Sequence, residues 1–191
     1  MRKLFYGFLL MFLSFDLSFN GHGLDVLPDF VGYFLLIRGM KEMAPESGLF
    51  RNARPFAVGM MVYSAILWVG DLLAVTGEGW LSQILDLIAM IVALYIAWVL
   101  IRAVQETEAS RIAELNSGKL LACWKGLAAI QVAAQVLGLM INLANLGVLI
   151  GLIALLGLAA FVVNILYLIA WWKATRAYEA LPPRMAAPEF N

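Results

Sequence analysis

Long apolar segments recur along this chain and constrain its fold more than any other feature. A helix needs about 20 mostly apolar residues to cross the hydrocarbon core of a bilayer. Six segments approach or exceed this length, and we expect each to form a membrane-spanning helix: residues 4–20, 26–41, 55–75, 80–103, 119–143 and 148–172. Hydrophobic residues make up 63% of the chain and charged residues 14%, against about 45–50% and about 25% in soluble domains. The sequence therefore predicts an all-α integral membrane bundle, with residues 1–181 as one six-helix domain and residues 182–191 as a flexible cytoplasmic tail.

Lysine and arginine predict the orientation of these spans, because basic residues resist transfer across the membrane. If the N-terminus is cytoplasmic, all 13 basic residues fall on the cytoplasmic side, so we expect both termini there. The outer connections are short, which predicts three antiparallel helical hairpins; they read NGHGLD, TGEG and NLANLG. The net charge is zero, so nucleic acid is not an expected partner. The expected partners are the lipid bilayer and either a second membrane protein or another copy of this chain.

The three inward-running helices end in similar sequences. These are GYFLLIRGMKE at 32–42, LYIAWVLIRAVQE at 94–106 and LYLIAWWKATRAYE at 166–179. The second and third hairpins also begin with the same dipeptide, Ser47-Gly48 and Ser117-Gly118. Duplication of one hairpin would explain these matches. A general preference of membrane helices for Tyr and Trp at interfaces, followed by basic residues inside, would explain them equally well.

Two local patterns predict contacts of individual helices. Residues 104–118 are expected to extend the fourth helix into the cytosol, with Glu108 and Arg111 spaced for an i,i+3 ion pair. Gly147 and Gly151 form a GxxxG motif, which permits close approach of two helices.

Acidic residues gather toward the outer face, in and beside the first two outer turns. These residues are Asp16, Asp25, Asp29, Asp71, Glu78 and Asp86. Asp86 lies about six residues into its helix, where a carboxylate is costly unless it faces the bundle interior, a cavity or a partner. It is therefore either a cation or proton site, or a residue near the headgroups or in an interhelical hydrogen bond.

The fifth span carries a stripe of polar and small residues. Gln131, Gln135, Gly138, Asn142 and Asn145 are spaced 4, 3, 4 and 3, which places them along one helical face. Because amides facing lipid are penalised, we expect this stripe to face the bundle interior, with Asn164 of the sixth span as a partner. The stripe is either a polar path from the outer acids or a set of amide bonds that fix the packing.

The second span begins with a segment, GHGLDVLPDF, that contains the only histidine. If the helix begins at residue 26, Asp25 and Asp29 lie four residues apart on one face, just after His22. Acidic residues and Pro28 fit the first turn of a helix, which would need no ligand. Alternatively, His22, Asp25 and Asp29 form a site for zinc or another divalent cation, the cofactor that this sequence suggests.

The stretch LDVLPDFVGYFLLIRGM at residues 24–40 resembles a sequence motif of other proteins. Uncharacterised small multi-pass membrane proteins of Gram-positive bacteria share the pattern Leu-Pro-Asp-Phe-x-Gly-Tyr at the start of an apolar helix. The resemblance implies a protein of a bacterial plasma membrane, and it implies no particular activity.

No nucleophile elbow, P-loop, HExxH motif or dinucleotide fingerprint occurs in the sequence, so a non-enzymatic function is our first hypothesis. We expect a transporter, or a membrane component that binds a solute or cation, with an outward-facing acidic pocket. The candidate ligand-binding residues are Asp16, Asp25, Asp29, Asp71, Asp86, Gln131, Gln135, Asn142 and Asn164. One alternative is a non-catalytic subunit of a membrane complex. Another is a metal-dependent membrane enzyme acting on a lipid or a diphosphate, with Asp25 and Asp29 holding the metal.

Overall fold

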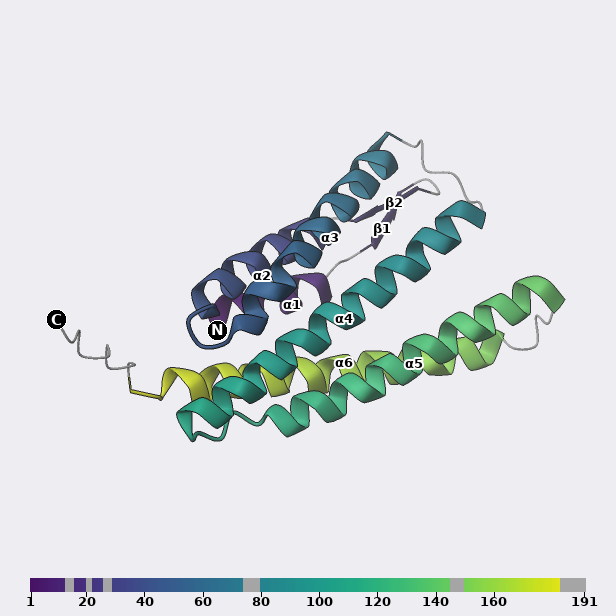
Figure 1. Cartoon of the computed structure of the whole chain (residues 1–191). Coiled ribbons are helices and arrows are strands. Elements are labelled where there is room, and N and C mark those ends of the chain that lie inside the picture. Colours follow the sequence, from purple (N-terminus) through teal and green to yellow (C-terminus); the bar gives the residue numbers. More distant parts are fainter. Residues whose placement is uncertain (13–15, 20–21, 26–28, 74–79, 145–149, 183–191) are drawn as a thin grey trace.

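A computed structural model describes residues 1–12, 16–19, 22–25, 29–73, 80–144 and 150–182. The side chains of residues 16–19, 22–25, 71–72, 81, 141–144 and 150 are not part of that description. The described residues form six helices and one two-stranded antiparallel sheet (Figure 1). The helices are α1 (Arg2–Phe12), α2 (Asp29–Met43), α3 (Gly48–Leu72), α4 (Trp80–Arg111), α5 (Ser117–Ala144) and α6 (Ile150–Glu179). The strands β1 (Asp16–Phe19) and β2 (His22–Asp25) lie between α1 and α2 in the chain.

Four of the described helices are long and apolar enough to cross a membrane. The stretches that qualify are Gly48–Gly70, Ser82–Arg111, Ser117–Met140 and Gly151–Glu179. They overlap the third to sixth predicted spans, so the prediction of long apolar helices at these four places is confirmed. Large apolar side chains on these helices point away from the bundle, including Ile66 and Leu155, which are 65% and 64% exposed. Such surfaces are compatible with a membrane protein, because lipid tails are as apolar as these side chains.

The first two predicted spans differ from the structure. A continuous helix over residues 4–20 is wrong, because α1 ends at Phe12 and residues 16–19 form β1, paired with β2. The described second helix begins at Asp29, and residues 26–28 of the predicted span lie outside the described residues. At about 1.5 Å per residue, α1 is about 16 Å long and α2 about 22 Å, both shorter than the roughly 30 Å hydrocarbon core. In the sequence, Asn20-Gly21 separates the two strands, and this dipeptide is the one preferred in two-residue hairpin turns.

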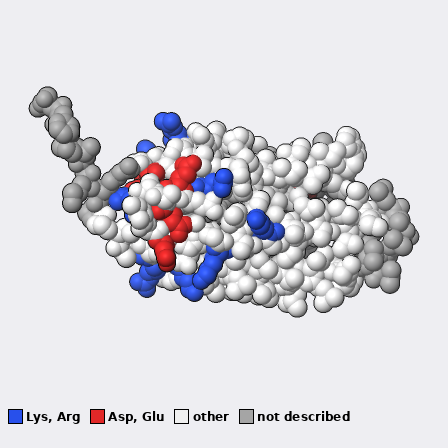
Figure 2. All heavy atoms as spheres, turned by 60° about the horizontal axis from the view of Figure 1, so that its bottom comes forward, with Lys and Arg blue, Asp and Glu red and all other residues white. Residues whose placement is uncertain are grey.

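The six helices form a ring. Each helix packs against the next along the chain, and α1 also packs against α6, while β2 contacts α3. At one end of the ring lie the start of α1, the α2–α3 and α4–α5 connections and the end of α6 (Figure 1). We call this the basic end. Figure 2 shows that Lys, Arg, Asp and Glu on the face drawn there gather toward this end.

The even-numbered helices share an aromatic–arginine contact spaced i,i+4. The guanidinium carbon lies over the ring at 4.5 Å for Arg38 and Phe34, 5.9 Å for Arg102 and Trp98, and 5.1 Å for Arg176 and Trp172. When the helices are aligned on these pairs, Leu36, Leu100 and Ala174 occupy equivalent positions, and each is 0% exposed. Each of these residues lies two positions from both members of its pair, and therefore on the opposite side of the helix, which faces the bundle.

Polar contacts join the helices at the basic end. Arg111, at the end of α4, donates to both carboxylate oxygens of Glu46, at 2.9 and 2.5 Å, and the Tyr178 hydroxyl donates to the same carboxylate at 3.0 Å. The fourth helix extends to Arg111, but residues 113–116 are not helical and α5 begins at Ser117, so the predicted extension over residues 104–118 is only partly confirmed. The predicted ion pair between Glu108 and Arg111 is wrong, because Glu108 accepts hydrogen bonds from a backbone N–H and from the Ser117 hydroxyl. This region therefore ties α4 to the start of α5 and to the α2–α3 connection.

Helices α1 and α2 approach each other closely at glycine residues. A Cβ atom on Gly7 would lie 2.8 Å from the carbonyl oxygen of Gly32, and one on Gly39 would lie 2.9 Å from the backbone nitrogen of Leu4. The GxxxG motif had instead predicted a close approach of two helices at Gly147 and Gly151. A Cβ on Gly151 would meet nothing within 4 Å, so that prediction is wrong for Gly151, while Gly147 lies outside the described residues.

Candidate functional site

A cavity of about 380 Å³ lies inside the ring, and five helices contribute to its lining: α1, α2, α4, α5 and α6. Its polar side chains are Asp29, Tyr33, Gln131, Asn164 and Tyr167. The cavity therefore brings together Asp29, Gln131 and Asn164, which the sequence places on three separate spans. We call it the central cavity.

The central cavity lies at one level of α2, α4 and α6. In the alignment on the aromatic–arginine pairs, Asp29, Ala93 and Tyr167 are equivalent, and all three line the cavity. The level of Leu36, Leu100 and Ala174 follows seven residues later, about 10 Å toward the basic end. Those side chains belong to one buried apolar cluster. The cavity is therefore closed toward the basic end by packed apolar side chains.

Two polar groups of the lining are deeply buried. The Tyr167 side chain is 5% exposed, and its hydroxyl oxygen has no hydrogen-bond partner within the described part of the chain. The Asp29 carboxylate has one fully buried oxygen, Oδ1. Leaving a buried hydroxyl without a hydrogen bond costs about 1–3 kcal/mol.

Aromatic rings form the wall of the cavity on the α1 side. The Phe8 ring packs edge-on against Tyr167, with centroids 5.5 Å apart, and against Trp171 at 5.0 Å. Phe12 packs against Phe161 at 5.8 Å. These contacts fix two cavity-lining rings, Phe8 and Phe12, against α6.

Two other predicted residues, Asp86 and Gln135, line a different hollow. This groove of about 500 Å³ lies between α4 and α5. Asp86 is exposed there, and its Oδ1 accepts a hydrogen bond of 3.4 Å from the Tyr63 hydroxyl. Asp29 and Asp86 therefore do not share a pocket, which corrects the expectation of one outer acidic pocket for this pair. The predicted stripe is also divided, because Gln131 lines the central cavity and Gln135 lines the groove.

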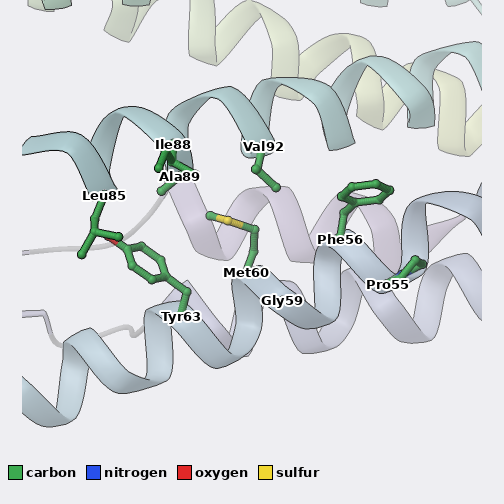
Figure 3. Close-up of a pocket in the computed structure, with 9 residues that line it drawn as sticks. All are labelled: Pro55, Phe56, Gly59, Met60, Tyr63, Leu85, Ile88, Ala89 and Val92. Carbon is green, nitrogen blue, oxygen red and sulfur yellow. The ribbon is translucent and has the colours of Figure 1, made fainter.

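A third hollow, of about 420 Å³, lies between α3 and α4 (Figure 3). Phe56, Met60 and Tyr63 point from α3 toward Leu85, Ala89 and Val92 on α4. Among the side chains that line this hollow, only Tyr63 carries an oxygen or nitrogen atom, in its hydroxyl group. A groove of this kind has little with which to fix a polar ligand, so the central cavity is the better candidate.

Several predicted site residues have side chains outside the described part of the chain. These are Asp16, His22, Asp25, Asp71 and Asn142, and Asn145 of the predicted stripe lies outside it entirely. Their proposed role in ligand binding stays a prediction.

The backbone alters the predicted metal site. Asp25 lies in β2 and α2 begins at Asp29, so the expected i,i+4 placement of these two residues on one helix is wrong. The strand register instead pairs Asp16 with Asp25 and Phe19 with His22. Among the side chains that the structure does describe, no three His, Cys, Asp or Glu residues lie close enough to hold a metal ion.

Sequence reasoning missed Tyr167, because a tyrosine near the end of an apolar helix is typical of membrane interfaces. No sequence signal could have found it, because the match between Tyr167 and Asp29 emerges only when the helices are aligned on the aromatic–arginine contacts of the structure.

Protein-family models, curated proteins and solved structures were all compared with the chain, and none matches it. The candidate site is therefore defined by geometry: one carboxylate, two amides and two phenols around a cavity at the centre of a helical ring.

Proposed function

We propose that this chain is a six-span protein of a bacterial plasma membrane that binds a small polar solute in its central cavity, as a transporter or a solute-binding component of one. In this proposal both termini are cytoplasmic and the basic end faces the cytoplasm. The helices α1 and α2, with the β1–β2 hairpin between them, complete the first pair of crossings, and three similar hairpins surround the cavity.

One observation carries the proposal. Polar residues that are far apart in the sequence and lie in apolar segments, Asp29, Gln131 and Asn164, line the same cavity. Polar groups within membrane helices are costly, and they mark substrate or ion pathways when they face a cavity. Transporters built from repeated helical units also bind their substrates near the bilayer midplane, between the repeats.

Closure toward the basic end supports a transport role in particular. The apolar level formed by Leu36, Leu100 and Ala174 separates the cavity from the basic end. A solute bound above this level could leave toward that end only after the level opens, which is the behaviour required of a gate.

The test compares matched substitutions inside and outside the central cavity. Purified protein in nanodiscs is exposed to a panel of amines, amino acids, alcohols, carboxylates and sugars, and stabilisation against heat identifies binders. Gln131→Leu should abolish the stabilisation, whereas Gln135→Leu, one helical turn further along α5, should retain it. Uptake of the same solute into proteoliposomes then separates a transporter from a binding component. Absence of any stabilising solute, or equal effects of the two substitutions, would overturn the proposal.

A further inference from the structure

We infer that the ligand of the central cavity is a small primary amine in its protonated form, with an apolar body. This inference rests on the proposed function, because it names the class of solute that the cavity binds. Three features of the lining lead to it: its charge, its hydrogen-bond acceptors and its aromatic wall.

The charge of the lining selects a cation. The Asp29 carboxylate is the one acidic group of the lining, and none of the described Lys and Arg side chains belongs to it. An anionic ligand would therefore face a like charge in a site of low dielectric constant. A divalent metal ion prefers several oxygen ligands with more than one carboxylate among them. One carboxylate matches an organic ligand with a single positive charge.

The acceptors of the lining select a cation that carries N–H groups. A primary ammonium group has three donors and no acceptor. The amide oxygens of Gln131 and Asn164 and the carboxylate of Asp29 supply acceptors from three different helices. Tyr167 lines the cavity as well, while its buried hydroxyl lies beside Trp171, which is not part of the lining.

The remaining lining selects a small apolar body next to the charge. The rings of Phe8, Phe12 and Tyr33 line the cavity together with Leu36 and Ile96. Aromatic faces attract organic cations, and apolar side chains gain from covering an alkyl group. The volume of about 380 Å³ lies near the lower limit of ligand pockets, which are about 300–1,000 Å³. A ligand the size of an amino acid or a short alkylamine fits this description.

The first experiment uses the wild-type chain, so it does not depend on the folding of a variant. Binding of n-butylammonium, 1-butanol, butyrate and butyltrimethylammonium to the protein in nanodiscs is measured by calorimetry. We expect n-butylammonium to bind most tightly, at least about 10-fold above the alcohol, since a charge-assisted hydrogen bond contributes about 1.5–3 kcal/mol. Equal or tighter binding of the alcohol or of butyrate would overturn the cationic class while leaving a solute site in place. Equal binding of butyltrimethylammonium would overturn the requirement for N–H donors. If none of the four compounds binds saturably, this inference is overturned. The proposed function would then be decided by the separate solute panel described for it.

The second experiment locates the binding with paired variants. Asp29→Asn should weaken binding of n-butylammonium by at least about 10-fold, and Asn164→Leu should weaken it less. Asp86→Asn makes the same chemical change on the exposed groove and should leave the affinity unaltered. Undiminished binding to both Asp29→Asn and Asn164→Leu would overturn the assignment to this cavity. If Asp29→Asn does not fold, Asn164→Leu and Gln131→Leu still decide the question.

Discussion

Replacing Gly39 by alanine tests the close packing of α1 on α2. The added Cβ would lie 2.7 and 2.8 Å from two side-chain carbons of Leu4 and 2.9 Å from its backbone nitrogen. Rotation of the Leu4 side chain can relieve the first two contacts. The third involves the α1 backbone, so the two helices must move apart.

The expected loss of stability follows from two opposing effects. Overpacking costs about 1–3 kcal/mol, and the better helix propensity of alanine offsets at most about 1 kcal/mol of it. We therefore expect Gly39→Ala to lower the free energy of unfolding by about 1–2 kcal/mol. Gly151→Ala is the matched control, because a Cβ there meets nothing within 4 Å. It should be neutral or slightly stabilising.

Unfolding in mixed micelles by added dodecyl sulfate, followed by circular dichroism, measures both free energies. Leu4→Ala alone should cost about 2–5 kcal/mol, because Leu4 is fully buried. The cost of Gly39→Ala is therefore measured again in a Leu4→Ala background, where it should shrink only in part, because the backbone nitrogen remains in the way. Equal free energies for Gly39→Ala and Gly151→Ala would refute the close approach of α1 and α2. A Gly39→Ala substitution without cost in the Leu4→Ala background would refute the role given to the backbone.

Three further predictions concern the rest of the bundle. Trp124→Phe removes the 3.0 Å hydrogen bond from the indole to a carbonyl of α4. This substitution should lower the free energy of unfolding by about 0.5–1.5 kcal/mol. The control Trp80→Phe changes a residue that is 74% exposed and should leave the free energy of unfolding unchanged. Arg111→Lys should lower the thermal unfolding midpoint, because an ammonium group cannot reproduce the two-pronged bond to the glutamate of the α2–α3 connection; an unchanged midpoint would contradict this. In a Cys123→Ser background, a membrane-impermeant maleimide added to intact cells should label Trp80→Cys and spare Ala113→Cys, and the reverse pattern would invert the proposed orientation.

The sequence predicts the four long helices well and the first pair poorly, and the reason is physical. Long apolar segments report only how much apolar surface must be buried or placed in lipid, and α3 to α6 satisfy this requirement as continuous helices. The segment after α1 is also apolar, but it contains Asn20-Gly21, whose turn preference competes with helix formation. Hydropathy does not register that competition.

The sequence also predicts only part of the candidate site. Helical spacing predicts that Gln131 and Gln135 lie on one face of α5, but it does not specify which neighbouring helix covers each turn. In the structure the first glutamine lines the central cavity, while the second lines the groove between α4 and α5. The role of Tyr167 depends on the packing of α6 against α1, which no local pattern encodes.

The proposed repeat of three hairpins has a consequence for how a ligand would lie in the cavity. A ring made of three identical hairpins would present the same side chain three times around its centre, and a ligand there would have three indistinguishable orientations. Asp29, Ala93 and Tyr167, which line the cavity, instead give it a charged wall, a small wall and an aromatic wall, so one ligand pose would be favoured. In the proposed arrangement the hairpins would be parallel copies rather than inverted ones. No internal symmetry would then exchange the two mouths of the ring, and in a transporter each mouth would open by a motion of its own.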